Sequence, residues 1–311
     1  MTLMSVDELN VVFHGEDIVK AVNNVSFSID KGEILALVGE TGCGKSVVAH
    51  AIMRLLPSEA VVKGNIAFEE HHNLLILDEG TMCSFRGNRI SVIFQNPSLS
   101  LNPVQKSGIQ IAEPLRIHRG IKKETALEKA ASLLKKIGFS DTEEIMDLYP
   151  GQCSGGMNQR YLIAAGAITE PSLIIADEPT KGLDADLVSH VENNLLSISK
   201  QKGISMLLIT HDLSVARNIA DRIAVMYAGE IVEIAEVDTF FERPLHPYSR
   251  GLLQSLPENG FVPIPGDSVN SGKIKGCYFS SRCTEKMSGC LEEHPPLYTT
   301  QNRQVRCFKE C

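Results

Sequence analysis

The sequence predicts an α/β fold with a mostly parallel sheet at its core and a phosphate-binding loop between a strand and a helix. Residues 34–38 (ILALV) are continuously apolar, as in a strand buried on both faces of a parallel sheet. A glycine-rich segment, 39–46, follows at once and precedes a helical stretch over 47–56. Beyond residue 170, strand and helix patterns alternate, which is typical of a parallel α/β sheet.

Composition limits the class of protein. A chain of 311 residues with 43% hydrophobic residues can form one large domain with a small appendage. The net charge of −8 argues against a surface that coats nucleic acid, so we expect no nucleic-acid partner. No run of 18 apolar residues occurs, and Asp7 and Glu8 stand where a signal peptide would be basic or apolar. We therefore expect a cytoplasmic protein that reaches a membrane only through a partner.

The remaining elements can be placed in chain order. Residues 3–13 and 25–29 are rich in β-branched residues and predict N-terminal antiparallel strands. Helical periodicity over 107–118 and 122–137 predicts a helical subdomain inserted at about 97–170. The later alternation predicts strands at 173–176, 206–210 and 222–227, and helices at 185–202 and 213–220.

The composition changes at about Pro257, where the chain becomes rich in Pro, Gly, Ser and Cys. This shift predicts two parts: a large domain over 1–256 and a small cysteine-containing extension over 257–311.

The segment GETGCGKS fits the phosphate-loop pattern G-x-x-x-x-G-K-[ST]. Its glycines allow successive backbone N–H groups to turn inward around phosphate oxygens, Lys45 adds a point charge, and the Ser46 hydroxyl can bind Mg²⁺. The alternative is a plain glycine-rich turn, which the preceding strand and following helix disfavour. The predicted nucleotide-binding residues here are Gly39, Glu40, Thr41, Gly42, Cys43, Gly44, Lys45, Ser46 and Val47.

Two carboxylates close the apolar run LIIADE, residues 173–178. At the end of a buried strand, Asp177 is expected to reach Mg²⁺ through its water shell, and Glu178 to polarise an attacking water. The alternative is an acidic pair that merely follows a strand at the surface.

The segment CSGGMNQR, residues 153–160, lies about twenty residues before these carboxylates. Ser154 and two glycines open a helix, so a hydroxyl and free N–H groups can face an anion. The segment resembles the signature sequence of ATP-binding-cassette (ABC) proteins, in which Leu more often stands at the position of Cys153. The resemblance implies that this face closes over ATP bound by the opposite subunit. The residues it assigns to that contact are Ser154, Gly155, Gly156 and Gln159.

Further landmarks of the family follow in order. Gln95, in VIFQNPSLSLNP, is similar to the Q-loop glutamine that senses Mg²⁺ and the transport subunit. Asp184, in KGLD, stands at the dimer-contacting D-loop, where relatives more often have Ser-Ala-Leu-Asp. His211, in LLITHD, resembles the switch histidine at the γ-phosphate. A lone histidine after a strand is more often structural, but five landmarks at the family's spacing reverse those odds.

The resemblance also implies which of these residues act in catalysis and which bind Mg²⁺. Glu178, His211 and Gln95 are assigned to catalysis, and Ser46, Gln95 and Asp177 to Mg²⁺. Phe13 is the nearest upstream aromatic residue that could stack on adenine, and a plain core role is its alternative.

Three longer segments narrow the resemblance: FRGNRISVIFQNPSLSLNP, YPGQCSGGMNQR and RPLHPYSRGLLQSLP. They look like the ATPase subunits of importers of dipeptides, oligopeptides or nickel. The resemblance implies an ATP-hydrolysing subunit at the cytoplasmic face of the cell membrane. It further implies a homologous second ATPase subunit (a heterodimer, or a homodimer), two permease subunits and an extracytoplasmic solute-binding protein. The competing interpretation is a soluble ABC-type ATPase with no transporter.

Five of the eight cysteines fall in the last 35 residues. Because a reducing cytosol disfavours disulfides, this cluster indicates first a metal site. The spacing of Cys277, Cys283, Cys290 and Cys307 is similar to that in the tails of these importers. Four thiolates can hold a [4Fe–4S] cluster, which the resemblance favours, or zinc, and free thiols are the third alternative. Cys311 has no assignment.

Overall fold

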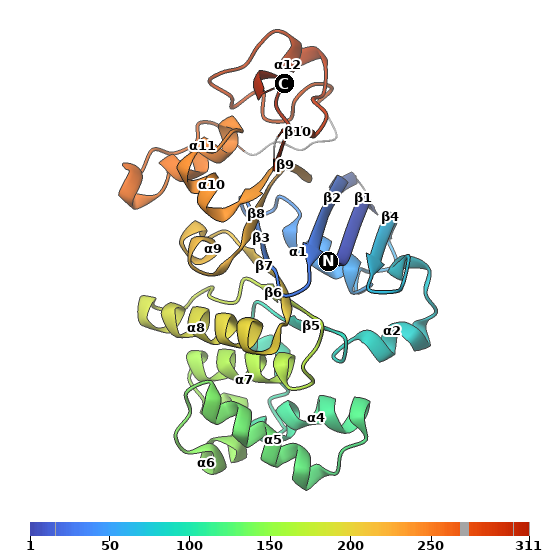
Figure 1. Ribbon diagram of the computed structural model, residues 1–311, viewed down its shortest axis with the longest axis vertical. Helices are drawn as coiled ribbons and strands as arrows, with labels where there is room; N and C mark the ends of the chain where they lie inside the picture. The colour runs from blue at the N-terminus through green and yellow to red at the C-terminus, as the bar shows by residue number, and fades with distance from the viewer. Residues whose placement is uncertain (16, 268–273, 301, 311) are drawn as a thin grey trace. The chain divides into compact units, whose positions relative to one another are not determined.

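The structure is a computed structural model of residues 1–311, described here for all residues except 16, 268–273, 301 and 311. The chain divides into two compact units, Met1–Ile76 with Ile209–Cys311, and Leu77–Leu208 (Figure 1). Each unit is described by itself. Within the described residues, no helix is both long enough and apolar enough to cross a bilayer.

The first unit begins with an antiparallel sheet of three strands in the order β2-β1-β4 (Figure 1). β1 spans Thr2–His14, β2 spans Ile18–Asp30 and β4 spans Ala60–Phe68. Met4, Val6 and Leu9 of β1 are fully buried, so one face of this sheet contributes to the core. The predicted antiparallel N-terminal strands are confirmed, although β2 begins well before residue 25.

A second sheet of the first unit supports the glycine-rich loop. β3 (Ile34–Val38) is buried throughout and pairs in parallel with β8 (Arg222–Tyr227). β9 (Glu230–Glu236) continues antiparallel to β8. The strands β11 (Arg303–Val305) and β10 (Tyr298–Thr300) extend this edge, giving the order β10-β11-β9-β8-β3.

Short helices connect and follow the strands of the first unit. α1 spans Lys45–Ile52, two residues earlier than predicted at its start, because Gly44 rather than a residue nearer Val47 caps it. It ends before residue 56 because Arg54 takes a left-handed conformation, with φ of 52°, ahead of Pro57. The other helices are α9 (Leu213–Ile219), α10 (Val237–Glu242), α11 (Pro247–Gln254) and α12 (Gly289–Glu292).

The second unit contains the parallel pair β5 (Ile90–Ile93) and β6 (Leu173–Asp177). β7 (Ser205–Thr210) is the next strand of the chain. The helices are α2 (Glu79–Phe85), α3 (Pro97–Ser100), α4 (Ser107–Arg119), α5 (Lys123–Lys136), α6 (Thr142–Asp147), α7 (Gly155–Ala167) and α8 (Ala185–Lys202).

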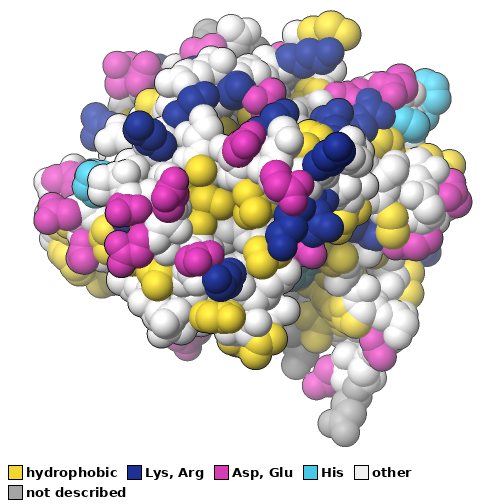
Figure 2. All heavy atoms as spheres, turned by 90° about the horizontal axis from the view of Figure 1, so that it is seen from below, with side chains coloured by type: hydrophobic (Ala, Val, Ile, Leu, Met, Phe, Trp, Pro, Cys, Tyr) yellow, Lys and Arg dark blue, Asp and Glu magenta, His cyan; other side chains and the backbone are white. Residues whose placement is uncertain are grey.

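The helices of the second unit bury one face each. On α5 the buried residues are Ala126, Ala130 and Leu134, which recur every four positions as an amphipathic helix requires. α7 lies between α4 and α8 and is buried along most of its length (Figure 1). The helices predicted at 107–118, 122–137 and 185–202 are confirmed. On the face drawn in Figure 2, both acidic and basic side chains occur, with hydrophobic side chains between them.

Candidate nucleotide-binding site

The glycine-rich loop has a backbone that only glycine can follow. Gly39, Gly42 and Gly44 have φ angles of 153°, 85° and 108°. A Cβ on Gly39 would lie 2.1 Å from the carbonyl oxygen of Met226, and one on Gly44 would lie 2.3 Å from that of Ala21. The loop therefore passes against the end of β8 and against β2 with no room for a side chain.

Lys45 lies within this loop rather than out in solution. Its side chain is 5% exposed, and Nζ donates hydrogen bonds to the carbonyl oxygens of Gly39 at 2.7 Å and Glu40 at 3.0 Å. Burial raises the pKa of the neighbouring Cys43 thiol, an effect that the charge of Lys45 opposes. The carbonyl oxygens of the loop thus hold the ammonium group in place. A bound phosphate would compete with them for it.

The first turn of α1 offers a second source of positive potential. Gly44 caps the helix without a side-chain hydrogen bond, and Ser46 and Val47 are half-buried in the first turn. The backbone N–H groups at a helix start carry partial positive charge and favour a bound phosphate. The donors present here, loop amides, one ammonium and one hydroxyl, fit a triphosphate with Mg²⁺.

Asp177 and Glu178 stand at the end of β6 in the second unit. They are 5% and 8% exposed, and Glu178 has a φ of 50°, a strained conformation for a residue with a side chain. Gln95 follows β5, the parallel neighbour of β6, with Ile93 opposite Ala176. Because the carboxyl ends of adjacent parallel strands share one edge of a sheet, these three side chains belong to the same edge.

The signature segment opens α7. Ser154 caps the helix by accepting a hydrogen bond from the N–H of Met157 at 3.2 Å, and Ser154 and Gly155 are exposed. Gly156 is buried against α8, since a Cβ there would lie 2.9 Å from Leu187 Cδ1. Asp184 caps α8 through the N–H of the same Leu187, at 3.0 Å. The starts of α7 and α8, and with them the signature and D-loop segments, therefore lie together.

Gln159 differs from the other signature residues. It is 3% exposed, and its Nε2 has no hydrogen-bond partner among the described residues. The sequence pattern did not predict this burial, since the residue lies more than one helical turn beyond the exposed start of α7.

The two remaining predicted residues lie in the first unit. His211 is exposed directly after β7, where Asp212 caps α9 through the N–H of Ser214 at 2.8 Å. Phe13 is half-buried on β1, opposite Val19 of β2 and Ala60 of β4. Their contacts with adenine and γ-phosphate remain predictions. The predicted residues thus form two sets, one in each unit.

A cavity of about 610 Å³ in the second unit is a separate feature. It is lined by residues of α4, α5, α7 and α8, among them Arg119, Lys129, Lys136 and Lys202. None of the residues predicted to bind nucleotide lines it, so volume alone does not identify the site.

The four tail cysteines share one small cavity in the first unit. Cys277, Cys283, Cys290 and Cys307 line it together with Phe279 and other apolar residues. Burial, and then the neighbouring thiols, raise the pKa of Cys277 to about 11. Within the described residues, however, no group of three or more His, Cys, Asp or Glu side chains is placed to hold a metal ion. The shared cavity therefore does not by itself establish a metal site. Cys311 lies outside the described residues.

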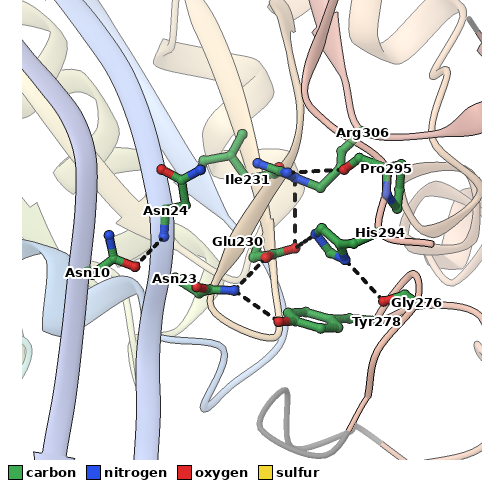
Figure 3. Close-up of polar contacts among 10 residues, drawn as sticks. All are labelled: Asn10, Asn23, Asn24, Glu230, Ile231, Gly276, Tyr278, His294, Pro295 and Arg306. Carbon is green, nitrogen blue, oxygen red and sulfur yellow. Dashed lines mark hydrogen bonds and ion pairs between the residues drawn. The ribbon is translucent and has the colours of Figure 1, made fainter. Parts of the chain in front are cut away.

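A polar network joins the tail to the sheets of the first unit (Figure 3). Glu230, 3% exposed at the start of β9, accepts a hydrogen bond from Asn23 of β2 at 2.7 Å. His294 Nε2 lies 2.9 Å from the Glu230 carboxylate, and His294 Nδ1 lies 3.0 Å from the carbonyl oxygen of Gly276. The contact with Glu230 raises the pKa of His294.

This network lies beside the support of the loop. The residue before Glu230, Gly229, donates its N–H to the carbonyl oxygen of Cys43 at 3.0 Å. Its own carbonyl oxygen accepts a hydrogen bond from the N–H of Asn23 at 2.8 Å. The same short turn therefore holds the phosphate loop on one side and the tail on the other.

Comparison with known families identifies the chain. Residues 22–181 match the model of the ABC transporter family, and residues 232–290 match the oligopeptide/dipeptide transporter C-terminal region. The chain belongs to the ABC transporter family, as an ATP-binding protein with this C-terminal region. It is an ABC-type ATPase.

Individual relatives are similar over nearly the whole chain. The oligopeptide transport ATP-binding protein AppD of Bacillus subtilis is 42% identical over 99% of this chain and 96% of its own length. The dipeptide transport ATP-binding protein DppD of Haemophilus influenzae is 38% identical over 99% of this chain and 95% of its own. Among solved structures, the cassette MJ0796 bound to ADP and Pi, in a dimeric post-hydrolysis state, is 27% identical. It superimposes with a TM-score of 0.68 over 76% of this chain and 99% of its own.

Proposed function

We propose that this chain is the ATP-hydrolysing subunit of an importer whose cargo is di- or oligopeptides. The observation that carries the proposal is the match of residues 232–290 to the oligopeptide/dipeptide transporter C-terminal region, beside the match of residues 22–181 to the ABC transporter family. Relatives named as oligopeptide and dipeptide transport proteins support it over 99% of the chain. Peptides are favoured over nickel because the two relatives described above are named for oligopeptide and dipeptide transport.

In this proposal the loop 39–46 binds the phosphates of ATP. Backbone N–H groups made available by three left-handed glycines converge on them, and Lys45 leaves its loop carbonyls to pair with a phosphate oxygen. Ser46, Gln95 and Asp177 would hold Mg²⁺, which neutralises charge on the phosphates when bound. Phe13 would stack on adenine.

Glu178 is the general base of the proposed reaction. Its burial at the strand end keeps its carboxylate away from bulk water, and its φ of 50° is a conformation that a residue with a side chain rarely adopts. It would take a proton from the attacking water, while His211 contacts the γ-phosphate. Replacement of this carboxylate by an amide removes the base and retains the shape.

A second ATPase subunit would complete the site. The exposed hydroxyl of Ser154 and the N–H groups at the start of α7 would face the γ-phosphate held by the partner, with Asp184 at the contact. The family resemblance also assigns Gln159 to this contact, but its burial suits a role in holding α7. Tighter binding of ATP to the closed state than to the open state would do work on two permease subunits, since equal affinity for both states shifts nothing. The partner is a homologous ATPase, the complex lies on the cytoplasmic face of the membrane, and a solute-binding protein delivers cargo outside.

Uptake of labelled peptides tests the function. Cells that lack this chain should lose uptake of labelled di- or oligopeptides, and the wild-type gene should restore it. The Lys45→Ala variant, expressed to the same level, should fail to restore it because its loop has lost the phosphate-pairing charge. Unchanged uptake in the deleted cells would overturn the peptide assignment, and absence of permeases from a gentle membrane purification would favour a soluble ATPase.

For the tail we propose a [4Fe–4S] cluster held by Cys277, Cys283, Cys290 and Cys307, with zinc as the alternative. Support comes from the small cavity that the four thiols share. Anaerobic purification should yield brown protein that contains iron and sulfide, and Cys283→Ser should lose both. The exposed Cys83, changed to Ser, is the matched control and should keep them. Colourless protein loaded with zinc, or with no metal, would contradict the cluster.

A further inference from the structure

Arg282 of the tail forms an ion pair with Glu40, the second residue of the phosphate loop. Its Nη1 and Nη2 donate to the two carboxylate oxygens of Glu40, at 2.9 Å each. A two-pronged arginine–carboxylate contact is among the strongest and most directional in proteins. The Arg282 side chain is 5% exposed and that of Glu40 28%, so water competes only weakly for the pair.

Arg282 is itself held on its other sides. Its Nε donates to the carbonyl oxygen of Pro265 at 2.9 Å, and its guanidinium lies 5.7 Å from the ring centre of Tyr227. These contacts fix the plane of the guanidinium and therefore the direction from which it meets Glu40.

The backbone of Glu40 is fixed as well as its side chain. Its N–H donates to the hydroxyl of Tyr248 at 2.9 Å, and Tyr248 is fully buried against Tyr227, with ring centres 4.6 Å apart. Its carbonyl oxygen accepts the hydrogen bond from Lys45. A single loop residue thus connects Arg282 with the lysine that is proposed to meet the phosphates.

We propose that Arg282 is a positioning residue for ATP binding, acting through Glu40 on the phosphate loop. Loop amides bind phosphate best when they already point at it, because ordering them on binding costs free energy. Arg282 supplies part of that order from a segment 242 residues away in the chain. The tail is therefore part of the machinery that sets ATP affinity, besides any role it has in peptide transport.

Steady-state ATPase kinetics of the full chain, assembled with its second ATPase subunit, give the first test. Arg282→Ala should raise the KM for ATP about tenfold, within the range usual for coupling between sites. The kcat should change by less than about threefold, because Glu178 and Ser154 keep their own contacts. Arg282→Lys, which keeps the charge but not the two-pronged contact, should fall between.

A matched control separates positioning from folding. Arg222→Ala removes an ion pair of similar length in the same unit, Arg222–Glu33 at 2.9 Å, which does not touch the loop. It should leave the KM for ATP unchanged. An equal rise in KM in this control would overturn the proposal, and so would a folded Arg282→Ala protein with wild-type KM.

A double-mutant cycle with Glu40→Gln tests the route of the effect. Gln keeps the shape of Glu40 but loses the charge, so this variant alone should also raise the KM and remains usable if Arg282→Ala fails to fold. In the Glu40→Gln background, Arg282→Ala should add little further effect. Full additivity would mean that Arg282 does not act through Glu40.

Amide hydrogen exchange distinguishes a positioning role of Arg282 from a role in stability alone. Because coupling between two sites is reciprocal, MgATP should slow amide exchange around residues 277–283 of the wild-type chain. The Arg282→Ala protein should lose this response while its loop still binds ATP at higher concentration. Equal nucleotide-dependent protection in both proteins would contradict the proposal.

Discussion

The phosphate loop and the C-terminal tail of this chain reach a fixed geometry by opposite means. The loop, 39–46, is shaped by backbone: three glycines with positive φ, two of them pressed against carbonyl oxygens. The tail, 257–311, is held by charged side chains, of which Arg282 meets Glu40, Arg303 meets Glu233 and His294 meets Glu230. The loop should therefore be intolerant of added atoms, and the tail of lost charges.

The difference also explains why the loop can be recognised from the sequence and the contacts of the tail cannot. A backbone-built loop requires particular residues at adjacent positions, so it leaves a contiguous pattern. Ion pairs between distant segments leave no such pattern, since any surface arginine looks the same in sequence.

Among the variants that test this difference, we expect the largest loss of stability on replacing Glu233. This carboxylate is fully buried, accepts the N–H groups of Leu245 at 2.9 Å and His246 at 2.8 Å, and pairs with Arg303 at 2.6 Å. Glu233→Ala leaves Arg303 buried without its partner, so the free energy of unfolding should fall by about 3–5 kcal/mol. Chemical denaturation measures it.

The control for that variant is Glu242→Ala, at an exposed position of α10. Its effect should stay within about 0.5 kcal/mol. Comparable losses in the two variants would mean that the tail does not depend on its buried charge.

In the loop, Gly44→Ala should be next in size. The new Cβ would meet the Ala21 carbonyl oxygen at 2.3 Å, and φ is 108°, so we expect a loss of about 2–4 kcal/mol with weakened ATP binding. Gly42→Ala is the matched variant: φ is also positive, at 85°, but no atom lies within 4 Å. It should cost only about 1–2 kcal/mol.

Thermal unfolding and ATP titration of both glycine variants measure the difference. If Gly42→Ala is as damaging as Gly44→Ala, conformational strain alone governs the loop and the close approach to β2 has no separate importance.

The smallest effect is a pH dependence of tail docking. The pKa of His294 is raised by Glu230, so the protonated form stabilises the folded tail. That contribution is complete below the pKa of the unfolded chain, about 6.5, and is lost as the pH rises through the higher folded value. Glu230 also faces Arg306, with 3.8 Å between Arg306 Nε and the carboxylate.

Proteolysis of the tail between pH 6 and pH 9 measures this effect. Cleavage should accelerate with pH in the wild type by a factor of a few, since the His294 side chain is 29% exposed and a partly exposed ion pair contributes only about 1 kcal/mol. His294→Gln should show no such rise beyond the protease's own pH profile. A rise of the same size in that variant would assign the pH dependence to another group.

Much of the fold could be predicted where pattern and structure coincide. Buried strands such as 34–38 are uniformly apolar, and the helices of the second unit show clear periodicity. The first half of β2 was missed because Lys20, Asn23 and Asn24 interrupt the apolar alternation. β4 was missed because Lys63, Gly64 and Asn65 lie in its middle.

The site divides in the same way. The loop and the strand-end carboxylates could be predicted because each is a short contiguous motif. The Glu40–Arg282 contact could not, since its residues are 242 positions apart. The burial of Gln159 was also beyond the motif, because it depends on how α7 packs within the second unit.

The most direct test of the account is association of this ATPase with its second ATPase subunit around nucleotide. The Glu178→Gln variant, which should hydrolyse ATP slower by about 10²–10⁴-fold, keeps the γ-phosphate in place during the measurement. Light scattering should show a dimer of ATPase subunits with MgATP, and separate subunits with MgADP or after Lys45→Ala. Subunits that bind ATP but remain separate would contradict a triphosphate shared between one chain's loop and the other chain's helix start.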